Sequence, residues 1–167
     1  MKRPRLSRED WTDLALKILG DNGPEGLTVE AVCKAAERTR GSLYHHFADI
    51  DALLIGVLER WREKHTDDVI ETVERNRTSL AGKAMSLNTL AFSLDSNVER
   101  NARRLVARRP QLRHLVADVD ARRIRYLVEL MQRDAGIEQV QAELLAQIEY
   151  AAWIGFLHLE PEPDRKR

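Results

Sequence analysis

The sequence predicts an all-α protein, with an N-terminal helix-turn-helix domain of three helices and a C-terminal helical bundle. Apolar residues recur at three- and four-residue intervals along most of the chain, and the period-two runs typical of strands are missing. Only five prolines and eight glycines interrupt 167 residues, of which 43% are hydrophobic and 32% charged. This composition is typical of a folded helical protein long enough to bury a core.

The first predicted helix follows a short basic arm, Met1 to Leu6. Ser7 is a good N-cap, and Asp10 suits the first helical turn. The buried stripe of this helix is predicted to contain Trp11, Leu14, Ala15, Ile18 and Leu19. We expect the helix to end at Gly20 and residues 20–26 to form a turn. A phosphate-binding loop is a poor alternative for this glycine-rich run, because it follows a helix and no Gly-Lys-Ser/Thr comes after it.

Two short helices separated by a tight turn are predicted between Thr28 and Phe47. Thr28 is expected to cap the first of them, and Thr39 the second. Leu43 and Phe47 are four residues apart and should face the interior. The apolar face of the first short helix is predicted to contain Val29, Val32, Cys33 and Ala36.

The outward side chains of the second short helix suit contact with double-stranded DNA. A helix-turn-helix lays its second helix in the major groove. Arg40 can form two parallel hydrogen bonds to the O6 and N7 atoms of guanine. Gly41 has no side chain, so a base or a backbone can approach closely there. Ser42, Tyr44 and His45 can bind phosphate oxygens.

The segments Thr28-Val29-Glu30-Ala31-Val32 and Arg40-Gly41-Ser42-Leu43-Tyr44-His45-His46-Phe47 resemble the DNA-binding signature of TetR-type transcriptional regulators. The resemblance covers residues 7–60 and continues into the second half only as helical character. It implies a transcriptional repressor that binds a palindromic DNA operator as a homodimer and responds to a small-molecule effector. The DNA-binding residues predicted from the motif and the resemblance are Arg5, Thr28, Arg38, Thr39, Arg40, Gly41, Ser42, Tyr44 and His45.

Three positions depart from the pattern of this family. Glu37 stands where members usually have a glycine, and a non-glycine residue at positive φ costs about 1 kcal/mol, so a slightly different turn is expected. Arg38 replaces a small apolar residue, and it either covers the core with its stem or reaches a phosphate. Ile50 replaces a common lysine, which removes one expected phosphate contact.

Five further helices are predicted after the motif. Asp49 is expected to cap a long helix that runs to about Arg77 and couples the two halves mechanically. The others are expected at about 79–94, 98–109, 111–134 and 138–158, with Pro110 discouraging continuation of the second of these. The predicted domains are a helix-turn-helix DNA-binding domain at 1–48, a helical ligand-binding and dimerisation domain at 49–159, and a flexible tail at 160–167.

By the same resemblance, the second half is expected to enclose an apolar ligand pocket and to supply the dimer surface. The tentative pocket residues are Trp61, His65, Met85, Phe92, His114, Tyr126 and Trp153. The simplest alternative for the aromatic and methionine side chains is an ordinary core. The last two helices are expected to form a four-helix bundle between protomers, with candidate contacts Ile124, Leu127, Leu130, Leu144, Ile148, Ala151 and Leu157.

Several other classes of protein are disfavoured by the sequence. The single cysteine, Cys33, cannot form an internal disulfide, so the cytoplasm is the expected compartment. The longest apolar run, Ala151 to Leu157, is too short to span a membrane. No Gly-x-Ser-x-Gly elbow is present, and His45 and His46 diverge by about 100° around a helix, which disfavours a shared metal. We expect no enzyme activity, no cofactor and no metal.

The charge distribution keeps one alternative open. The chain carries 27 basic and 27 acidic residues, and its first 47 residues are almost neutral. Attraction of DNA would therefore be local and would depend on where each arginine stands. This weak basic charge, together with Ile50, favours the alternative of a helical interaction protein that keeps the fold but has lost sequence-specific DNA binding.

Overall fold

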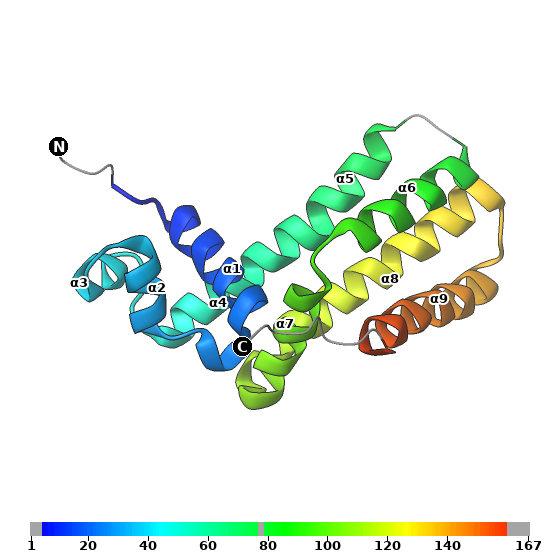
Figure 1. The fold of residues 1–167 in the computed structure, drawn as a ribbon. Coiled ribbons are helices and arrows are strands. Elements are labelled where there is room, and N and C mark those ends of the chain that lie inside the picture. The colour runs from blue at the N-terminus through cyan, green and yellow to red at the C-terminus, as the bar shows by residue number, and fades with distance from the viewer. Residues whose placement is uncertain (1–4, 77–78, 160–167) are drawn as a thin grey trace. The chain divides into compact units, whose positions relative to one another are not determined.

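The computed structural model describes residues 5–76 and 79–159. These residues form helices and no strand, which confirms the predicted all-α class. In chain order the elements are α1 Arg8–Gly26, α2 Val29–Ala36, α3 Arg40–Tyr44, α4 Ile50–Arg62, a π-helical turn Glu63–Asp67, α5 Asp68–Arg75, α6 Leu80–Ser93, α7 Ser96–Arg108, a 3-10 turn Pro110–Leu112, α8 Arg113–Ala135 and α9 Gln139–Leu159 (Figure 1).

The described chain divides into two compact units. Unit 1 contains residues 5–63 and 97–116, and unit 2 contains residues 64–96 and 117–159. The predicted boundary at residues 48 and 49 separates functions rather than packing units, and it stays a prediction. The predicted tail at 160–167 and the first four residues of the predicted basic arm lie outside the described residues.

The N-terminal helix α1 begins as predicted but ends later. Ser7 Oγ accepts a hydrogen bond from the Asp10 amide (3.1 Å), and the Asp10 carboxylate accepts one from the Ser7 amide (2.7 Å). Hydrogen bonds to this carboxylate from the Ser7 amide and from the Ser7 hydroxyl (2.9 Å) hold the pKa of Asp10 below its usual value. The predicted end at Gly20 is wrong, because the helix continues to Gly26 across a break at Gly23, which has φ +72°. Only glycine adopts this conformation without strain.

The break in α1 is bridged by a side chain from α7. Pro24 has no N–H to donate to the Gly20 carbonyl. Asn101 Nδ2 donates to that carbonyl at 3.2 Å and to the Leu19 carbonyl at 2.8 Å. Asn101 is buried, so these bonds satisfy groups that water does not reach. The α7 segment therefore fixes the end of α1 within unit 1.

Unit 1 is held together by an apolar core and by polar contacts between helices. The helix α1 packs on α4 and α2, and α2 packs on α3. Arg60 of α4 donates to both carboxylate oxygens of Asp13 of α1 (2.7 and 3.0 Å), and these hydrogen bonds raise the pKa of Arg60. The largest fully buried side chains of this core are Trp11, Leu19, Val32, Leu43, Phe47, Leu53, Val57, Leu58 and Trp61.

The long helix predicted to run from residue 50 to about Arg77 is found over residues 50–75, with one local change of helical form that was not predicted. Residues 63–67 form a π-helical turn between α4 and α5. No proline or glycine marks this place in the sequence. Arg123 of α8 donates to the Thr66 hydroxyl (2.8 Å) and to the His65 carbonyl (3.2 Å) of the turn. The wide turn is thus held by a partner distant in sequence, and such turns often occur at functional sites.

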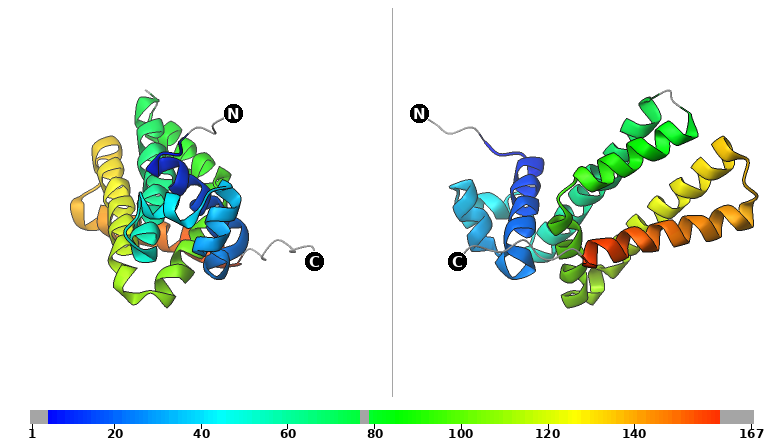
Figure 2. Two further views of the ribbon diagram at one scale, coloured as in Figure 1. Left: turned by 90° about the vertical axis from the view of Figure 1, so that its left-hand side faces the viewer. Right: turned by 45° about the vertical axis from the view of Figure 1, so that its right-hand side comes forward.

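Unit 2 contains α5, α6, the main part of α8, and α9. The last two helices, α8 and α9, are joined by a short loop, as the right-hand view of Figure 2 shows. Ala142 and Ala146 of α9 are fully buried against Leu127 and Val128 of α8, so small side chains allow close packing of these two helices. In the described part of the chain, no helix combines the length and apolar character needed to cross a bilayer.

Candidate nucleic-acid interface and ligand cavity

Local hydrogen bonds shape the segment from α2 to α3 as predicted. Thr28 Oγ1 accepts from the Ala31 amide (3.1 Å), and Thr39 Oγ1 accepts from the Ser42 amide (3.3 Å). Leu43 and Phe47 are buried and anchor α3 to the core. Cys33 is also buried, and burial raises the pKa of its thiol. Thr28 and Thr39 therefore act as helix caps in the free protein.

The turn keeps its tight form although Glu37 replaces the usual glycine. Glu37 ends α2 in the left-handed conformation, with φ 51° and ψ 45°. Its amide donates to the Lys34 carbonyl (3.1 Å), and the Arg38 amide donates to the Cys33 carbonyl (3.0 Å). The slightly different turn expected from the sequence is therefore not found. Glu37 therefore adopts the left-handed conformation that glycine adopts more readily, at a cost in backbone strain.

Replacing Glu37 by glycine is expected to stabilise the protein by about 0.5–1 kcal/mol. The left-handed conformation costs an L-residue roughly 1–2 kcal/mol, and the greater freedom of glycine in the unfolded chain offsets part of the gain. The measurement is urea unfolding followed by tryptophan fluorescence. Glu37→Ala is the control, since it removes the side chain but keeps the strain. An equal gain in both variants would show that the side chain, rather than φ, is responsible.

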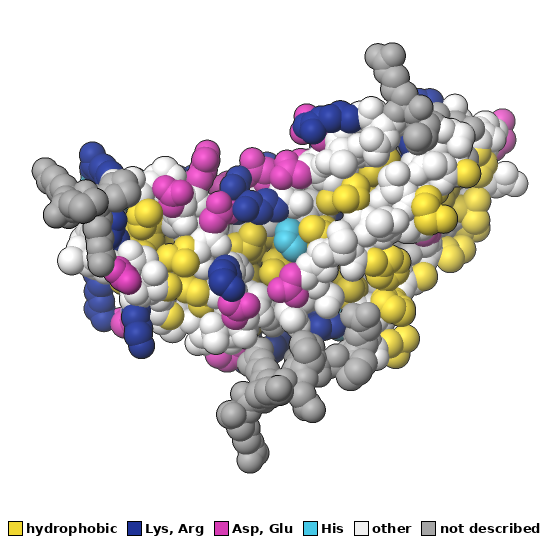
Figure 3. Space-filling model, turned by 45° about the horizontal axis from the view of Figure 1, so that its top comes forward, with side chains coloured by type: hydrophobic (Ala, Val, Ile, Leu, Met, Phe, Trp, Pro, Cys, Tyr) yellow, Lys and Arg dark blue, Asp and Glu magenta, His cyan; other side chains and the backbone are white. Residues whose placement is uncertain are grey.

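The predicted DNA-binding side chains differ in exposure. Gly41, Tyr44 and His45 are exposed on α3 and its end, whereas Ser42 is half-buried. Arg38 is half-buried and donates to the Glu37 carbonyl (3.2 Å). In Figure 3, separate groups of basic and acidic side chains lie among uncharged atoms at the N-terminal end of the molecule, with lysine and arginine in dark blue at its edge. A ligand approaching α3 meets donors at separate positions instead of a uniformly basic surface.

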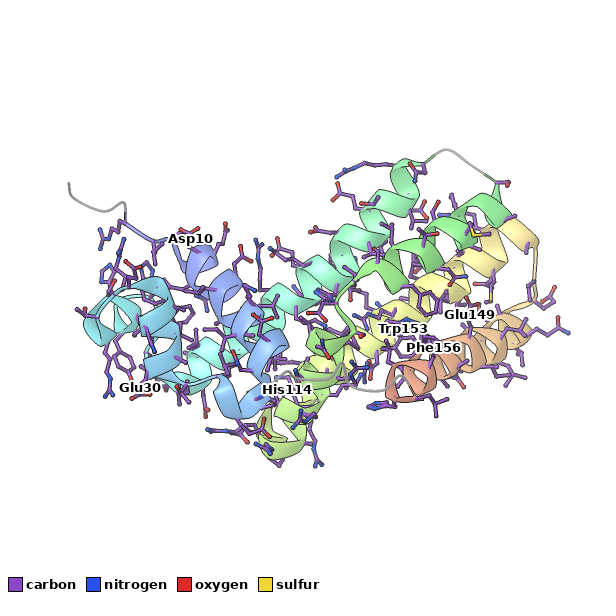
Figure 4. All side chains as sticks on the ribbon, in the orientation of Figure 1. Asp10, Glu30, His114, Glu149, Trp153 and Phe156 are labelled. Atoms are coloured by element: carbon purple, nitrogen blue, oxygen red, sulfur yellow. The ribbon has the colours of Figure 1, made fainter. Side chains whose placement is uncertain are left out.

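Two contacts hold predicted DNA-binding side chains in the free protein. The Arg40 guanidinium forms an ion pair with the Glu30 carboxylate of α2, and both side chains are more than half exposed. Arg5 Nη2 donates to His45 Nε2 at 2.6 Å, which ties residue 5 to the end of α3. The label of Glu30 on α2 in Figure 4 helps to locate the first contact. Glu30 was not among the predicted residues, and no local rule pairs residues ten apart across a turn.

Unit 2 contains a cavity of about 90 Å³ between α5, α6, α8 and α9. Three predicted pocket residues, His65, Tyr126 and Trp153, line it. Apolar carbon forms most of its wall, with a few polar groups among it, as is typical of small-molecule sites. The full lining is His65, Thr66, Val69, Ile70, Leu87, Asn88, Ala91, Leu94, Arg123, Tyr126, Leu127, Glu149, Tyr150 and Trp153.

The other four predicted pocket residues lie elsewhere. Trp61 is fully buried in unit 1, where its Nε1 donates to Glu99 (3.1 Å). His114 is also in unit 1, with Nδ1 3.0 Å from the Gln111 carbonyl. Met85 and Phe92 are exposed on α6. The apolar pattern of α6 does not show which side of the helix faces inward, so the prediction that Met85 and Phe92 line the pocket is wrong.

Arg123 is the centre of a polar network beside the cavity, and no pattern in the sequence predicts this role. Besides its bonds to the π-helical turn, it donates to Tyr150 Oη at 3.4 Å, and its guanidinium lies 5.1 Å from the Trp153 ring centroid. Tyr150 in turn donates to the Asp120 carboxylate (2.6 Å). Arg123 thus connects the π-helical turn to α9 across the cavity wall.

A second hydroxyl of the cavity is also bonded to a carboxylate. Tyr126 Oη donates to Glu74 at 2.8 Å. Hydrogen bonds from Arg133, and secondarily from Tyr126 and Lys83, hold the pKa of Glu74 below its usual value. Among the described residues, no group of three or more histidine, cysteine or acidic side chains could hold a metal ion.

Comparisons with known proteins agree with this geometry. Residues 12–57 match the family described as bacterial regulatory proteins, tetR family. A solved structure with a similar fold is the TetR family repressor AlkX from Dietzia sp. strain DQ12-45-1b, implicated in biodegradation of n-alkanes. It has 22% sequence identity and a TM-score of 0.51, over 96% of this chain and 88% of that chain. No curated protein matches the chain.

A helix-turn-helix within an all-α fold is typical of DNA-binding transcription regulators. The match to the tetR family covers residues 12–57, from within α1 into α4, and it confirms the resemblance predicted from the sequence.

Proposed function

We propose that this protein is a cytoplasmic, ligand-responsive transcriptional repressor, not an enzyme, and that it binds a palindromic operator as a homodimer. The observation that carries the proposal is the arrangement of α3. Leu43 and Phe47 fix it from the buried side, while Arg40, Tyr44 and His45 stand on the exposed side. This is the arrangement that places a recognition helix in a major groove.

Selection of bound duplexes from a random DNA pool tests DNA recognition directly. The expected winner is a palindrome whose half-sites are about one helical turn, roughly 34 Å, apart. Its affinity should fall as salt rises, because neutralised phosphates release counter-ions. Recovery of nothing above background would contradict the proposal and favour the alternative of an interaction protein that has lost DNA binding.

The outer side of α9 supports the homodimer. It exposes large apolar side chains that have no place in the protomer core, and exposed apolar patches mark interaction surfaces. Of the candidate contacts, Leu144, Ile148 and Ala151 are exposed, whereas Leu127, Leu130 and Leu157 are buried within the protomer and Ile124 packs against its core. The large exposed apolar residues of α9 are Val140, Leu144, Leu145, Ile148, Phe156 and Leu159.

Replacing Ile148 by aspartate is expected to weaken self-association at least about tenfold, because a charge then lies in the centre of an apolar interface. Size-exclusion chromatography with light scattering measures the shift towards monomer. Gln139→Asp is the matched control: residue 139 is exposed on the same helix, about 180° away around its axis. A dimer that tolerates Ile148→Asp would have its interface on another surface.

The cavity supports response to an effector. A ligand can shift an equilibrium only if it binds two states with different affinity. Arg123 provides a means for this, since it bonds the π-helical turn at the end of α4 and also α9. A ligand that competes for these bonds would change the stability of the turn and, through α4, the spacing of the two recognition helices.

A further inference from the structure

The cavity of unit 2 requires an apolar body in any molecule that fills it. Val69 and Ile70 of α5, Leu87 of α6 and Leu127 of α8 supply carbon on three sides. Water in such a space finds few hydrogen-bond partners, so an apolar group gains free energy by replacing it. This feature alone does not distinguish a neutral ligand from a charged one.

Most polar groups around the cavity already bond within the protein. Arg123 donates to Thr66, His65 and Tyr150. The hydroxyls of Tyr126 and Tyr150 each donate to a carboxylate. A ligand that used these groups would first have to break existing hydrogen bonds, so they offer little net attraction.

Three polar groups of the lining are exceptions: the Glu149 carboxylate, the Asn88 amide and the buried Trp153 Nε1, which has no hydrogen-bond partner among the described residues. The side chain of Glu149 lines the cavity, and within the described chain its carboxylate forms no hydrogen bond and no ion pair. It lies one turn before Trp153 on α9, as the labels in Figure 4 show, and next to Tyr150. On the α6 wall, Asn88 likewise has no hydrogen bond in this part of the structure. A negative charge and an amide are therefore available where the cavity opens to solvent.

The position of Glu149 on α9 separates it from the dimer surface. With about 100° per residue, Leu144, Ile148 and Ala151 fall on one side of the helix. Glu149 and Trp153 fall on the side that borders the cavity. The unpaired carboxylate is thus explained neither by the core nor by the apolar surface proposed for the second protomer.

Aromatic rings beside the carboxylate also suit a positive charge. The ring centroids of Tyr150 and Trp153 are 5.8 Å apart. Trp153 already accepts the Arg123 guanidinium over its ring, so its face tolerates a cation. Since Arg123 holds that place, a second cation would lie towards Glu149, where the two positive charges are farther apart and the carboxylate attracts the new one.

We propose that the cavity of unit 2 binds an amphipathic organic cation, an ammonium group attached to an apolar chain or ring, with Glu149 as its counter-ion. The apolar part occupies the space between α5, α6 and α8, and the ammonium group lies at the open end beside Glu149 and Asn88. This inference rests on the proposed effector response and deepens it by naming the class of ligand.

Calorimetric titration of the free, full-length protein tests the proposal without DNA. The probes are decyltrimethylammonium, decyl sulfate and 1-decanol, which share one apolar chain and differ in the charge of the head group. The ammonium probe is expected to bind at least about tenfold more tightly than the sulfate probe. Glu149→Gln should weaken its binding about three- to tenfold, as expected for a solvent-exposed charge pair with an aromatic neighbour. The same variant should leave decanol binding unchanged.

Two further variants keep the test specific. Glu143→Gln removes an equally exposed carboxylate of α9 that does not line the cavity, and it should leave binding unchanged. Ala91→Trp fills the cavity and should abolish binding of the ammonium probe. Binding that survives Ala91→Trp, or that is unaffected by Glu149→Gln, would overturn the proposal, and so would a preference for decyl sulfate or decanol.

The outcome of this titration is separable from that of the DNA experiments. If the ammonium probe binds as described but the protein selects no duplex, the ligand class stands and the proposed repressor function fails. If the protein selects a palindrome but the ammonium probe does not bind, the ligand class fails and DNA recognition stands. Fluorescence anisotropy of the selected duplex then shows whether a bound cation releases it.

Discussion

Replacing Glu99 by alanine is expected to destabilise the protein by about 3 kcal/mol. Glu99 is 3% exposed, and it accepts hydrogen bonds from Trp61 Nε1 (3.1 Å) and from Arg103 Nη2 (2.8 Å). Alanine would leave a buried indole N–H and a mostly buried guanidinium without this acceptor. Breaking a buried pair by removing one partner usually costs about 3–5 kcal/mol, and the partial exposure of Arg103 puts this case at the lower end.

Urea unfolding followed by circular dichroism measures this loss. Glu71→Ala is the matched control, because Glu71 forms an exposed ion pair with Arg75 of the same helix, and its removal should cost less than about 0.5 kcal/mol. Glu99→Gln keeps an acceptor for Trp61 and should lose less than alanine does. A Glu99→Ala variant as stable as the Glu71→Ala control would contradict the buried network.

Hydrogen bonds from α7 also stabilise the unit that contains α2 and α3. Glu99 bonds Trp61 of α4, and Asn101 bonds the end of α1. Arg104 donates to Glu25 (3.0 Å), also at the end of α1. The helix α7 is thus hydrogen-bonded to both α4 and the end of α1. Unit 1 is therefore more than the predicted domain at 1–48, since residues 97–116 complete its packing.

The parts of this fold that follow local rules could be predicted from the sequence. Ser7, Thr28, Thr39 and Asp49 are all N-caps whose side chains accept from an amide three residues later. Capping depends on four consecutive residues, and therefore on sequence alone. The buried pair Leu43 and Phe47 follows from helical periodicity in the same way.

The parts that depend on tertiary approach could not be predicted. The π-helical turn requires Arg123, which is nearly sixty residues away along the chain. The break in α1 at Gly23 is bridged by Asn101 of α7, which donates to the carbonyls of Leu19 and Gly20. On α9 apolar residues occur on both sides of the helix, so the pattern could not tell the buried Leu157 from the exposed Ile148. Only the placement of α8 decides between them.

The network around Arg123 determines which polar groups of the cavity wall already have partners, and residue types alone do not show this. His65, Tyr126 and Trp153 are predicted there from their aromatic or polar character. In the structure, the Tyr126 hydroxyl donates to Glu74, and the Arg123 guanidinium lies over the Trp153 ring. Glu149 was not expected, because an acidic residue on a helix is usually a solvated one. The role proposed for Glu149 rests on its place in the cavity wall and on its lack of a partner among the described residues. Neither follows from the sequence.

Replacing Arg40 by alanine is expected to weaken binding to the selected operator by about 1–3 kcal/mol for each half-site, and by about twice that for the proposed homodimer. Arg40 is the exposed guanidinium of α3, and Glu30 holds it without covering it. If it forms two hydrogen bonds to a guanine, its loss removes both the affinity and the preference for that base pair. Anisotropy titrations with the operator and with single-base variants measure the two effects separately.

Two controls distinguish base recognition from general charge. Arg75→Ala removes the same charge from α5 of unit 2 and should leave operator affinity nearly unchanged. Glu30→Gln releases Arg40 from an exposed ion pair, which is worth less than about 1 kcal/mol, so base preference should persist. If Arg40→Ala binds every duplex as the wild type does, α3 does not read DNA through this residue, and the interaction-protein alternative, favoured by the nearly neutral N-terminal segment and by Ile50, becomes the better account.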